Sequence, residues 1–85
     1  MEIVNELGFH TRTVTRFVQC ARSFESSVEV SMDGHVADGK SVLELLTLGA
    51  AKGKVLHLRV EGEDAKAALS SVKSLVERGF EEETE

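Results

Sequence analysis

The sequence predicts an α+β fold: a four-stranded, mostly antiparallel sheet with three helices on one face, in the order βαββαβα. Two observations predict it. In several short stretches apolar residues alternate with polar ones, which is typical of strands with one buried face. Between these stretches, apolar residues recur every three or four positions, which is typical of helices with one apolar stripe. An open-faced two-layer sandwich buries one face of every element.

The first elements are a short strand and a helix, separated by a glycine. Ile3 and Val4 lie in a strand predicted over Met1 to Asn5, and Gly8 then breaks the chain. Helical spacing predicts a helix over Thr11 to Phe24. Its apolar positions are Val14, Phe17, Val18, Ala21 and Phe24.

A β-hairpin is predicted after this helix. Residues alternate over Ser27 to Met32, and Asp33-Gly34 follows, a pair that tolerates the positive φ angles of a tight hairpin turn. His35 to Asp38 is the expected returning strand. The residues that share one face of the first strand are Val28, Val30 and Met32.

A short helix and a further strand come next. Ser41, followed three residues later by Glu44, matches a capping box and predicts a helix from Ser41 to near Gly49. A strand is predicted over Lys54 to Glu61, and Gly62 ends it. The residues on one face of this strand are Leu56, Leu58 and Val60.

The last predicted element is a helix that opens at Glu63 and Asp64, because acidic residues favour a helix N-terminus. Gly79 is the expected stop. We expect Glu81 to Glu85 to be a flexible acidic tail. The apolar stripe of the helix is Ala65, Ala68, Leu69, Val72, Leu75 and Val76.

Composition narrows the possible functions. The chain has 85 residues, which suits a single domain over 1–85 with a thin core. Its net charge of -5 argues against nucleic acid or an anionic membrane as the main partner. A lone cysteine, Cys20, fits a reducing compartment, and we expect neither a leader nor a membrane span. We therefore expect a cytoplasmic monomer.

The residues around His10 indicate a phosphoryl acceptor. His10 is expected just before a helix, whose N-terminal N–H groups and dipole favour an anion. Neutral imidazole is a nucleophile near pH 7, and Arg12 adds a charge that binds phosphate oxygens. Leu7 to Phe24 contains no acidic residue, so this helix is expected to dock an acidic partner. From the residues alone, one alternative remains: His10 caps a helix and the arginines form a solvated face.

Two motifs resemble one protein family. Gly8-Phe9-His10-Thr11-Arg12 is similar to the active-site signature of HPr, the histidine-containing phosphocarrier family of the bacterial sugar phosphotransferase system. Lys40-Ser41-Val42-Leu43, followed by Leu45 to Gly49, resembles the family's second signature, around its regulatory serine. The resemblance extends over essentially the whole chain, and the order βαββαβα is also that of the family.

The resemblance implies a phosphocarrier, not an enzyme with a substrate pocket, and no cofactor. His10 would be phosphorylated on Nδ1 by phosphorylated Enzyme I, which draws on phosphoenolpyruvate. It would then donate to a IIA domain of a sugar or nitrogen-related system. Arg12 would stabilise the phosphoryl group, with help from the backbone amides near Thr11.

The resemblance also implies a regulatory serine and a docking surface. Ser41 aligns with the serine that HPr kinase/phosphorylase modifies in some bacteria, and it is also the expected N-cap. We expect an exposed apolar patch on the helix that Ser41 begins, framed by polar residues of the first helix. The patch is Val42, Leu43 and Leu46, and the framing residues are Arg16, Gln19 and Arg22.

One residue departs from the family pattern. The family usually has proline directly after the arginine, where this chain has Thr13. Proline early in a helix pre-sets φ, so Thr13 predicts a less constrained first turn, and we expect Thr13→Pro to speed transfer. Threonine also restores a backbone N–H that can reach the phosphate.

Two alternative functions stay open. In the first, the chain is a nitrogen-branch or regulatory paralogue that binds proteins through Ser41 and its patch; Gly79-Phe80 and the acidic ending are similar to nitrogen-branch members. The second is a small-molecule or RNA-binding module, although the strands supply no basic or aromatic face. No metal site is expected, since Cys20, His35 and His57 lack ligand spacing.

Overall fold

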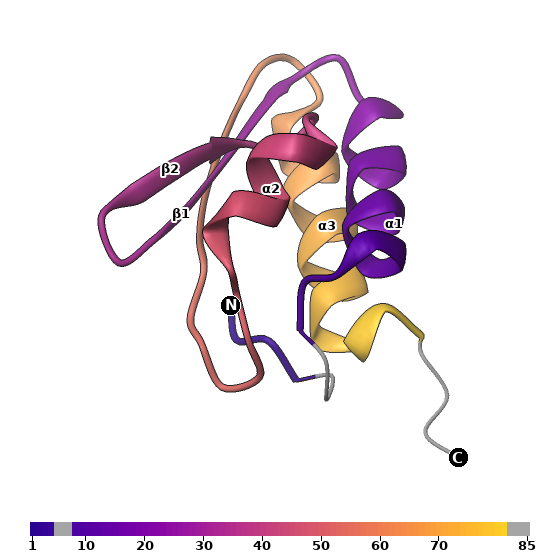
Figure 1. Cartoon of the computed structure of the whole chain (residues 1–85). Coiled ribbons are helices and arrows are strands. Elements are labelled where there is room, and N and C mark those ends of the chain that lie inside the picture. Colours follow the sequence, from indigo (N-terminus) through magenta and orange to yellow (C-terminus); the bar gives the residue numbers. More distant parts are fainter. Residues whose placement is uncertain (5–7, 82–85) are drawn as a thin grey trace.

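The computed structural model describes residues 1–4 and 8–81 and has the predicted two layers (Figure 1). Its elements follow the predicted order from the first helix onward. The expected acidic tail lies outside the described residues from position 82 on. In chain order the elements are α1 (Thr11–Arg22), β1 (Ser27–Met32), β2 (His35–Asp38), α2 (Val42–Leu48), β3 (His57–Glu61), α3 (Ala65–Glu77) and the 3-10 helix η1 (Gly79–Glu81).

The described residues form a three-stranded antiparallel sheet in the order β2-β1-β3. In the central strand, Val30 lies opposite Ala37 of β2 and Leu58 of β3. The turn between β1 and β2 is the predicted one, because Asp33 and Gly34 both have positive φ, 51° and 83°. The prediction of an antiparallel sheet built on this hairpin is confirmed.

The predicted first strand is reduced to a single bridge, so the described sheet has three strands and not four. Glu2 pairs with Val55, and the Ile3 N–H donates to the Lys54 carbonyl at 2.9 Å. Met1 and Leu56 exchange two backbone hydrogen bonds beside this bridge, and Ile3 is fully buried. Among residues 1–4 and 8–81, however, Glu2–Val55 is the one bridge outside the named strands. The following strand, β3, accordingly begins at His57 instead of Lys54. The last residue of the predicted first strand lies outside the described part of the chain.

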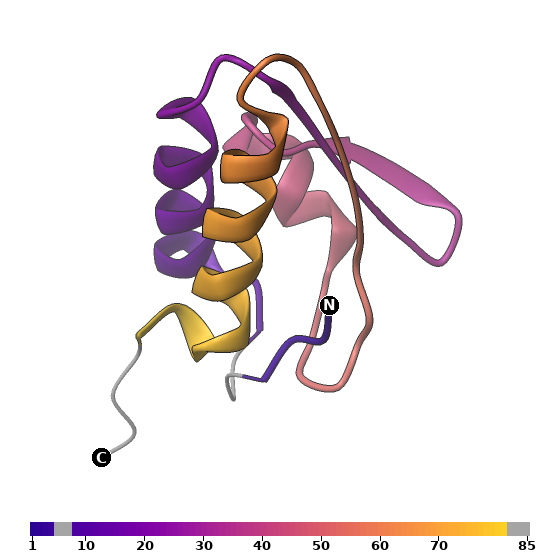
Figure 2. The ribbon, with the colours of Figure 1, turned by 180° about the vertical axis from the view of Figure 1, so that it is seen from behind.

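The three α-helices cover the same face of the sheet, as Figures 1 and 2 show from opposite sides. α1 lies beside α3, and α2 packs against α1 and β2. The other face of the sheet carries exposed residues of β1 such as Ser27 and Glu29. The predicted open-faced arrangement is therefore confirmed.

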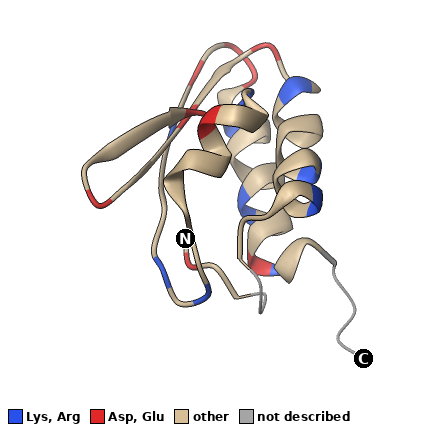
Figure 3. Ribbon diagram, in the orientation of Figure 1, with Lys and Arg blue, Asp and Glu red and all other residues tan. Residues whose placement is uncertain are grey.

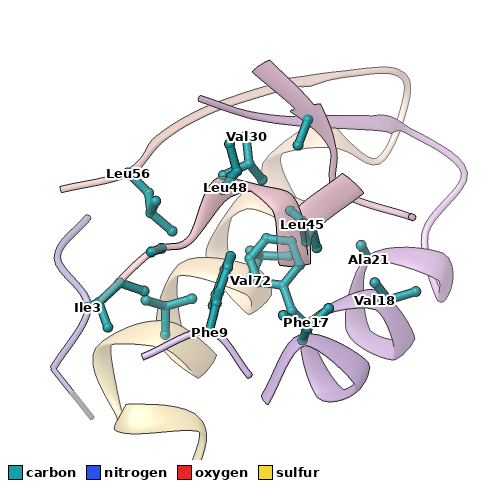
Figure 4. Close-up of a cluster of buried hydrophobic side chains, with 14 of the residues drawn as sticks. Ile3, Phe9, Phe17, Val18, Ala21, Val30, Leu45, Leu48, Leu56 and Val72 are labelled. Atoms are coloured by element: carbon teal, nitrogen blue, oxygen red, sulfur yellow. The ribbon is translucent and has the colours of Figure 1, made fainter. Parts of the chain in front are cut away.

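The hydrophobic core lies between the helices and the sheet (Figure 4). Phe17 of α1, Leu45 of α2 and Val72 of α3 meet there, and each is completely buried. Two aromatic residues from outside the α-helices join them. The ring centroid of Phe9 is 5.6 Å from that of Phe17 and 5.8 Å from that of Phe80, both in edge-to-face geometry. The loop before α1 and the short helix η1 are thus anchored in one core.

The ends of α2 follow the sequence prediction with one difference. The Ser41 hydroxyl accepts a hydrogen bond from the Glu44 N–H at 3.2 Å, as an N-cap should. The Glu44 carboxylate does not return to Ser41 but accepts from the Asp38 N–H at 3.0 Å, which ties α2 to the end of β2. Gly49 ends the helix in the left-handed conformation, with φ 64°.

Asp64 is the N-cap residue of α3, but its carboxylate binds a different segment. It accepts hydrogen bonds from the N–H groups of Glu25 and Ser26, each at 2.9 Å, and from the Ser26 hydroxyl. The Ser26 hydroxyl, followed by the Glu25 N–H, lowers the pKa of the Asp64 carboxyl. The expected acidic start of the helix therefore serves to hold the segment before β1 against the start of α3.

Asp64→Asn is expected to lower stability near neutral pH and to flatten its dependence on acidity. The unfolded carboxyl titrates near its ordinary pKa of about 3.9, so the unfolded chain binds the proton first as pH falls. The contribution of Asp64 is therefore complete above about pH 5 and is lost as pH falls through the lower folded pKa. Urea unfolding at about pH 3 and about pH 6 measures this. Equal losses in the native and Asp64→Asn proteins would contradict the role assigned to the carboxylate.

Candidate functional site

His10 is the N-cap residue of α1, at the position that the sequence predicted. Its backbone is extended (φ -135°, ψ -179°), and its carbonyl accepts the first helical hydrogen bond, from the Val14 N–H at 2.8 Å. The side chain is half-buried, and the first turn of the helix contains no acidic residue. The imidazole therefore stands where the N–H groups and dipole of a helix favour an anion.

Thr11 and Arg12 form the beginning of the first turn, and both side chains are exposed. The backbone N–H groups of a helix's first turn point out of its end, toward the N-cap residue. Arg12 lies two positions beyond His10 and adds a positive charge to this first turn, which contains no acidic residue. Nucleophile, N–H groups and arginine thus occur within one turn of chain.

The loop that carries His10 is held closely against the end of α2. Gly8 has φ 64°, and its backbone lies so near Ala50 and Ala51 that a Cβ at this position would collide with them. The next residue, Phe9, donates its N–H to the Ala50 carbonyl at 2.8 Å. Glycine is therefore required here both by the left-handed backbone and by the lack of space.

Thr13 is completely buried and bonds back to this loop. Its hydroxyl accepts from the His10 N–H at 3.0 Å and donates to the Gly8 carbonyl at 2.9 Å, with the His10 carbonyl at 3.3 Å. His10 and Thr13 pair as a capping box. These hydrogen bonds constrain the first turn in the absence of proline. Faster transfer in Thr13→Pro stays a prediction, and the structure argues against it because proline would remove the hydroxyl that makes these bonds.

The apolar patch expected on α2 is dominated by one residue. Leu43 is 75% exposed, whereas Val42 and Leu46 are half-buried and pack against the core. Leu45 and Leu48 are buried, as the sequence predicted. The exposed apolar surface of α2 is therefore mainly that of Leu43.

The polar residues of α1 lie in two places. Arg22 Nε donates to the Lys40 carbonyl at 3.1 Å, which sets this arginine beside the start of α2. Arg16 donates to the Phe80 carbonyl, and Arg16 and Gln19 line a groove between α1 and α3. Of these three residues, Arg22 contacts the segment that leads into α2, whereas Arg16 and Gln19 lie beside α3. Figure 3 shows that the basic positions follow α1 along its length.

Sequence reasoning did not find the part that Phe80 and Ala50 play in shaping the loop. Phe80 is fully buried and its ring packs against that of Phe9, and the Ala50 carbonyl accepts a hydrogen bond from the Phe9 N–H. For Phe80 a signal existed, since an isolated aromatic residue follows a glycine just after the last helix. For Ala50 there was none, because its role depends on its backbone carbonyl alone.

The other cysteine and histidine side chains, Cys20, His35 and His57, show no sign of a reactive or metal-binding site among the described residues. Burial raises the pKa of the half-buried Cys20 thiol, which keeps it protonated. His35 and His57 are exposed on their strands, as predicted. Within residues 1–4 and 8–81, no group of at least three His, Cys, Asp or Glu side chains lies close enough to hold a metal ion. In the same part of the chain, no helix has the length and apolar character needed to cross a membrane.

Comparison with known proteins decides the family. A family model described as the PTS HPr component phosphorylation site, where PTS is the phosphotransferase system, matches residues 1–78. The chain belongs to the HPr family. HPr is a phosphocarrier protein and not a catalytic enzyme, so the chain is a phosphocarrier of the phosphotransferase system, with other proteins of that system as partners.

Individual relatives agree over nearly the whole length. The phosphocarrier protein HPr of Neisseria meningitidis is 38% identical over 82 residues, which cover 96% of this chain and 92% of that protein. HPr of Xylella fastidiosa is 32% identical over 84 residues, 99% of this chain and 94% of that protein. The crystal structure of HPr from Thermoanaerobacter tengcongensis matches with a TM-score of 0.94 at 36% identity, covering 99% and 94% of the two chains. The predicted HPr-type fold is thereby confirmed.

Proposed function

We propose that His10 accepts a phosphoryl group from phosphorylated Enzyme I and passes it to a IIA domain. The observation that supports this most directly is the position of His10 as N-cap of α1, half-buried and next to a first turn with no acidic residue. A helix N-terminus favours a bound anion such as phosphate, and Arg12 adds a positive charge beside it.

The chemistry requires little beyond positioning. A nitrogen of the His10 imidazole attacks the phosphorus atom, a new N–P bond forms, and the bond from phosphorus to the donor breaks on the opposite side. The displaced group stays on Enzyme I, and the reverse geometry delivers the phosphoryl group to the IIA domain. Arg12 and the N–H groups of the first turn, Thr11 included, offset the charge on the transferring oxygens.

The docking surface follows from charge and exposed apolar area. The basic residues of α1 attract an acidic partner surface, and Leu43 supplies an exposed apolar contact beside them. Arg22 lies next to the start of α2, which makes it the arginine most directly linked to that contact. The full set of residues in this proposed surface is Arg16, Gln19, Arg22, Val42, Leu43 and Leu46.

Ser41 is the proposed regulatory position. Its hydroxyl is half-buried and caps α2, where a phosphate would be favoured by the helix N-terminus. The same phosphate would place negative charge next to Leu43 and near Arg22, and would weaken the attraction of an acidic partner. Incubation with HPr kinase/phosphorylase, followed by mass spectrometry of the native and Ser41→Ala proteins, tests whether the site is used.

Arg12→Ala is expected to slow phosphoryl uptake about 10- to 100-fold with little change in stability, because Arg12 is exposed and acts by charge. The measurement is the rate of transfer from Enzyme I under single-turnover conditions. Arg59→Ala is the matched control, since Arg59 is an exposed arginine on β3, in an ion pair with Glu61. Equal rates for the two variants would contradict a role for Arg12 in charge stabilisation.

The branch of the phosphotransferase system is tested by choice of donor. Uptake of phosphate is compared with Enzyme I of the sugar branch and with its nitrogen-branch counterpart at equal concentrations. Faster uptake from the sugar-branch donor would assign the chain to the sugar branch. Faster uptake from the nitrogen-branch donor would instead assign the chain to that branch. Uptake from neither donor would favour a regulatory paralogue that acts by binding alone.

A further inference from the structure

We propose that the buried hydroxyl of Thr13 is a positioning group for phosphoryl transfer, which fixes the backbone of His10 at the N-terminus of α1. The inference rests on the proposed function, in which His10 carries the phosphoryl group. Thr13 acts through His10 and does not itself contact the phosphate.

The hydroxyl joins both ends of the loop that carries His10. It accepts from the His10 N–H at 3.0 Å and donates to the Gly8 carbonyl at 2.9 Å, with the His10 carbonyl at 3.3 Å as a second acceptor. Thr13 has no exposed surface, so water cannot replace these hydrogen bonds from its side of the loop. A loss of the hydroxyl would remove the buried bond to the Gly8 carbonyl and the partly buried bond from the His10 N–H.

The loop is held from two opposite directions. On the side of α2, the Ala50 carbonyl receives the Phe9 N–H at 2.8 Å, and the backbone of Gly8 lies against Ala50. On the side of α1, the Thr13 hydroxyl binds Gly8 and His10. The contact from α2 fixes Phe9, whereas the contact from α1 reaches the backbone of His10 itself. The side chain of Thr13 therefore fixes the backbone position from which the His10 imidazole extends.

The group that positions His10 is therefore distinct from the residues proposed to bind partner proteins. The Thr13 hydroxyl is buried, whereas the proposed contacts with partner proteins, such as Arg22 and Leu43, are exposed. Transfer between two proteins depends on alignment at the reacting atoms, and a displacement of about 1 Å can reduce the rate about 100-fold. Loss of the hydroxyl should thus lower kcat for phosphorylation by Enzyme I and leave KM for this carrier nearly unchanged.

Thr13→Val tests this directly, because valine has nearly the same shape and no hydroxyl. We expect its kcat to fall about 10-fold or more, with KM within about twofold of the native value. Thr13→Ser retains the hydroxyl and should recover most of the native kcat. Thr13→Cys offers a weaker donor of similar size and should lie between serine and valine, which keeps the series informative even where valine folds poorly.

Ser26→Ala is the matched control for stability. Ser26 is also a buried hydroxyl residue, 2% exposed, and its hydroxyl binds Asp64 near the other end of α1 from His10. This variant removes a hydrogen bond of a buried side chain without touching the loop, and we expect native kcat from it. Circular dichroism at the assay temperature verifies that each protein is folded.

The outcomes are distinct. A native kcat in folded Thr13→Val, or an equal loss of kcat in Thr13→Ser, would overturn the positioning role. An equal loss in Ser26→Ala would also overturn it, since the effect would then follow stability. Failure of the native protein to take phosphate on His10 would overturn the proposed function, and it is recognised before any variant is compared.

Discussion

A His10→Ala protein is expected to take up no phosphate from Enzyme I while keeping its fold. The imidazole is the proposed nucleophile, and no other side chain in the first turn of α1 combines a nucleophilic nitrogen with that place on the helix. His10 is only half-buried and lies outside the hydrophobic core. Its replacement at an N-cap should therefore cost about 1 kcal/mol of stability or less.

The matched controls for this prediction are His35→Ala and His57→Ala. Both histidines are exposed on strands, so both variants should be labelled at the native rate with phosphoenolpyruvate that carries radioactive phosphorus. Circular dichroism confirms folding in all three variants. Label retained in His10→Ala, or lost in either control, would show that the acceptor has been assigned to the wrong histidine.

Phe17→Ala is expected to destabilise the protein by about 3 to 5 kcal/mol. Phe17 is completely buried in α1, and its ring packs edge-to-face with Phe9 at a centroid distance of 5.6 Å. Small domains unfold with about 5 to 15 kcal/mol in total, so this single cavity would remove much of the stability. Phe9 precedes the proposed acceptor directly, and its displacement should also disturb the loop.

Equilibrium unfolding in urea measures this effect as a shift in the midpoint. Leu43→Ala is a suitable comparison, because a leucine that is 75% exposed should change stability by no more than about 0.5 kcal/mol. A similar shift in the midpoint for both variants would contradict the core assigned to Phe17.

Local signals in the sequence explain which elements were predicted well. The Asp33-Gly34 turn, the Ser41 cap and the left-handed Gly49 each depend on the conformation of one or two residues. The first strand was not predicted correctly in extent, because a strand needs a partner. Its pairing partner, Val55, lies more than fifty positions away, and only the folded chain shows how few residues pair.

The same distinction holds for the site. His10 and Arg12 are neighbours in the chain, so their shared place at a helix N-terminus follows from the motif and the predicted helix start. The role of Thr13 does not follow from sequence, because its hydrogen bonds depend on how the loop folds back to bring the Gly8 carbonyl near. The contact of Arg16 with the Phe80 carbonyl joins residues from the two ends of the chain, and no pattern in either segment indicates it.

The most direct test of the central proposal is phosphorus NMR of the native protein after incubation with phosphoenolpyruvate and Enzyme I. We predict a single acid-labile phosphohistidine signal, with the largest amide shifts at His10 and the first turn of α1 in a nitrogen-proton spectrum of the same sample. An acid-stable signal, or none in a tube where a control carrier is labelled, would contradict the assignment of His10 as the residue that carries the phosphoryl group.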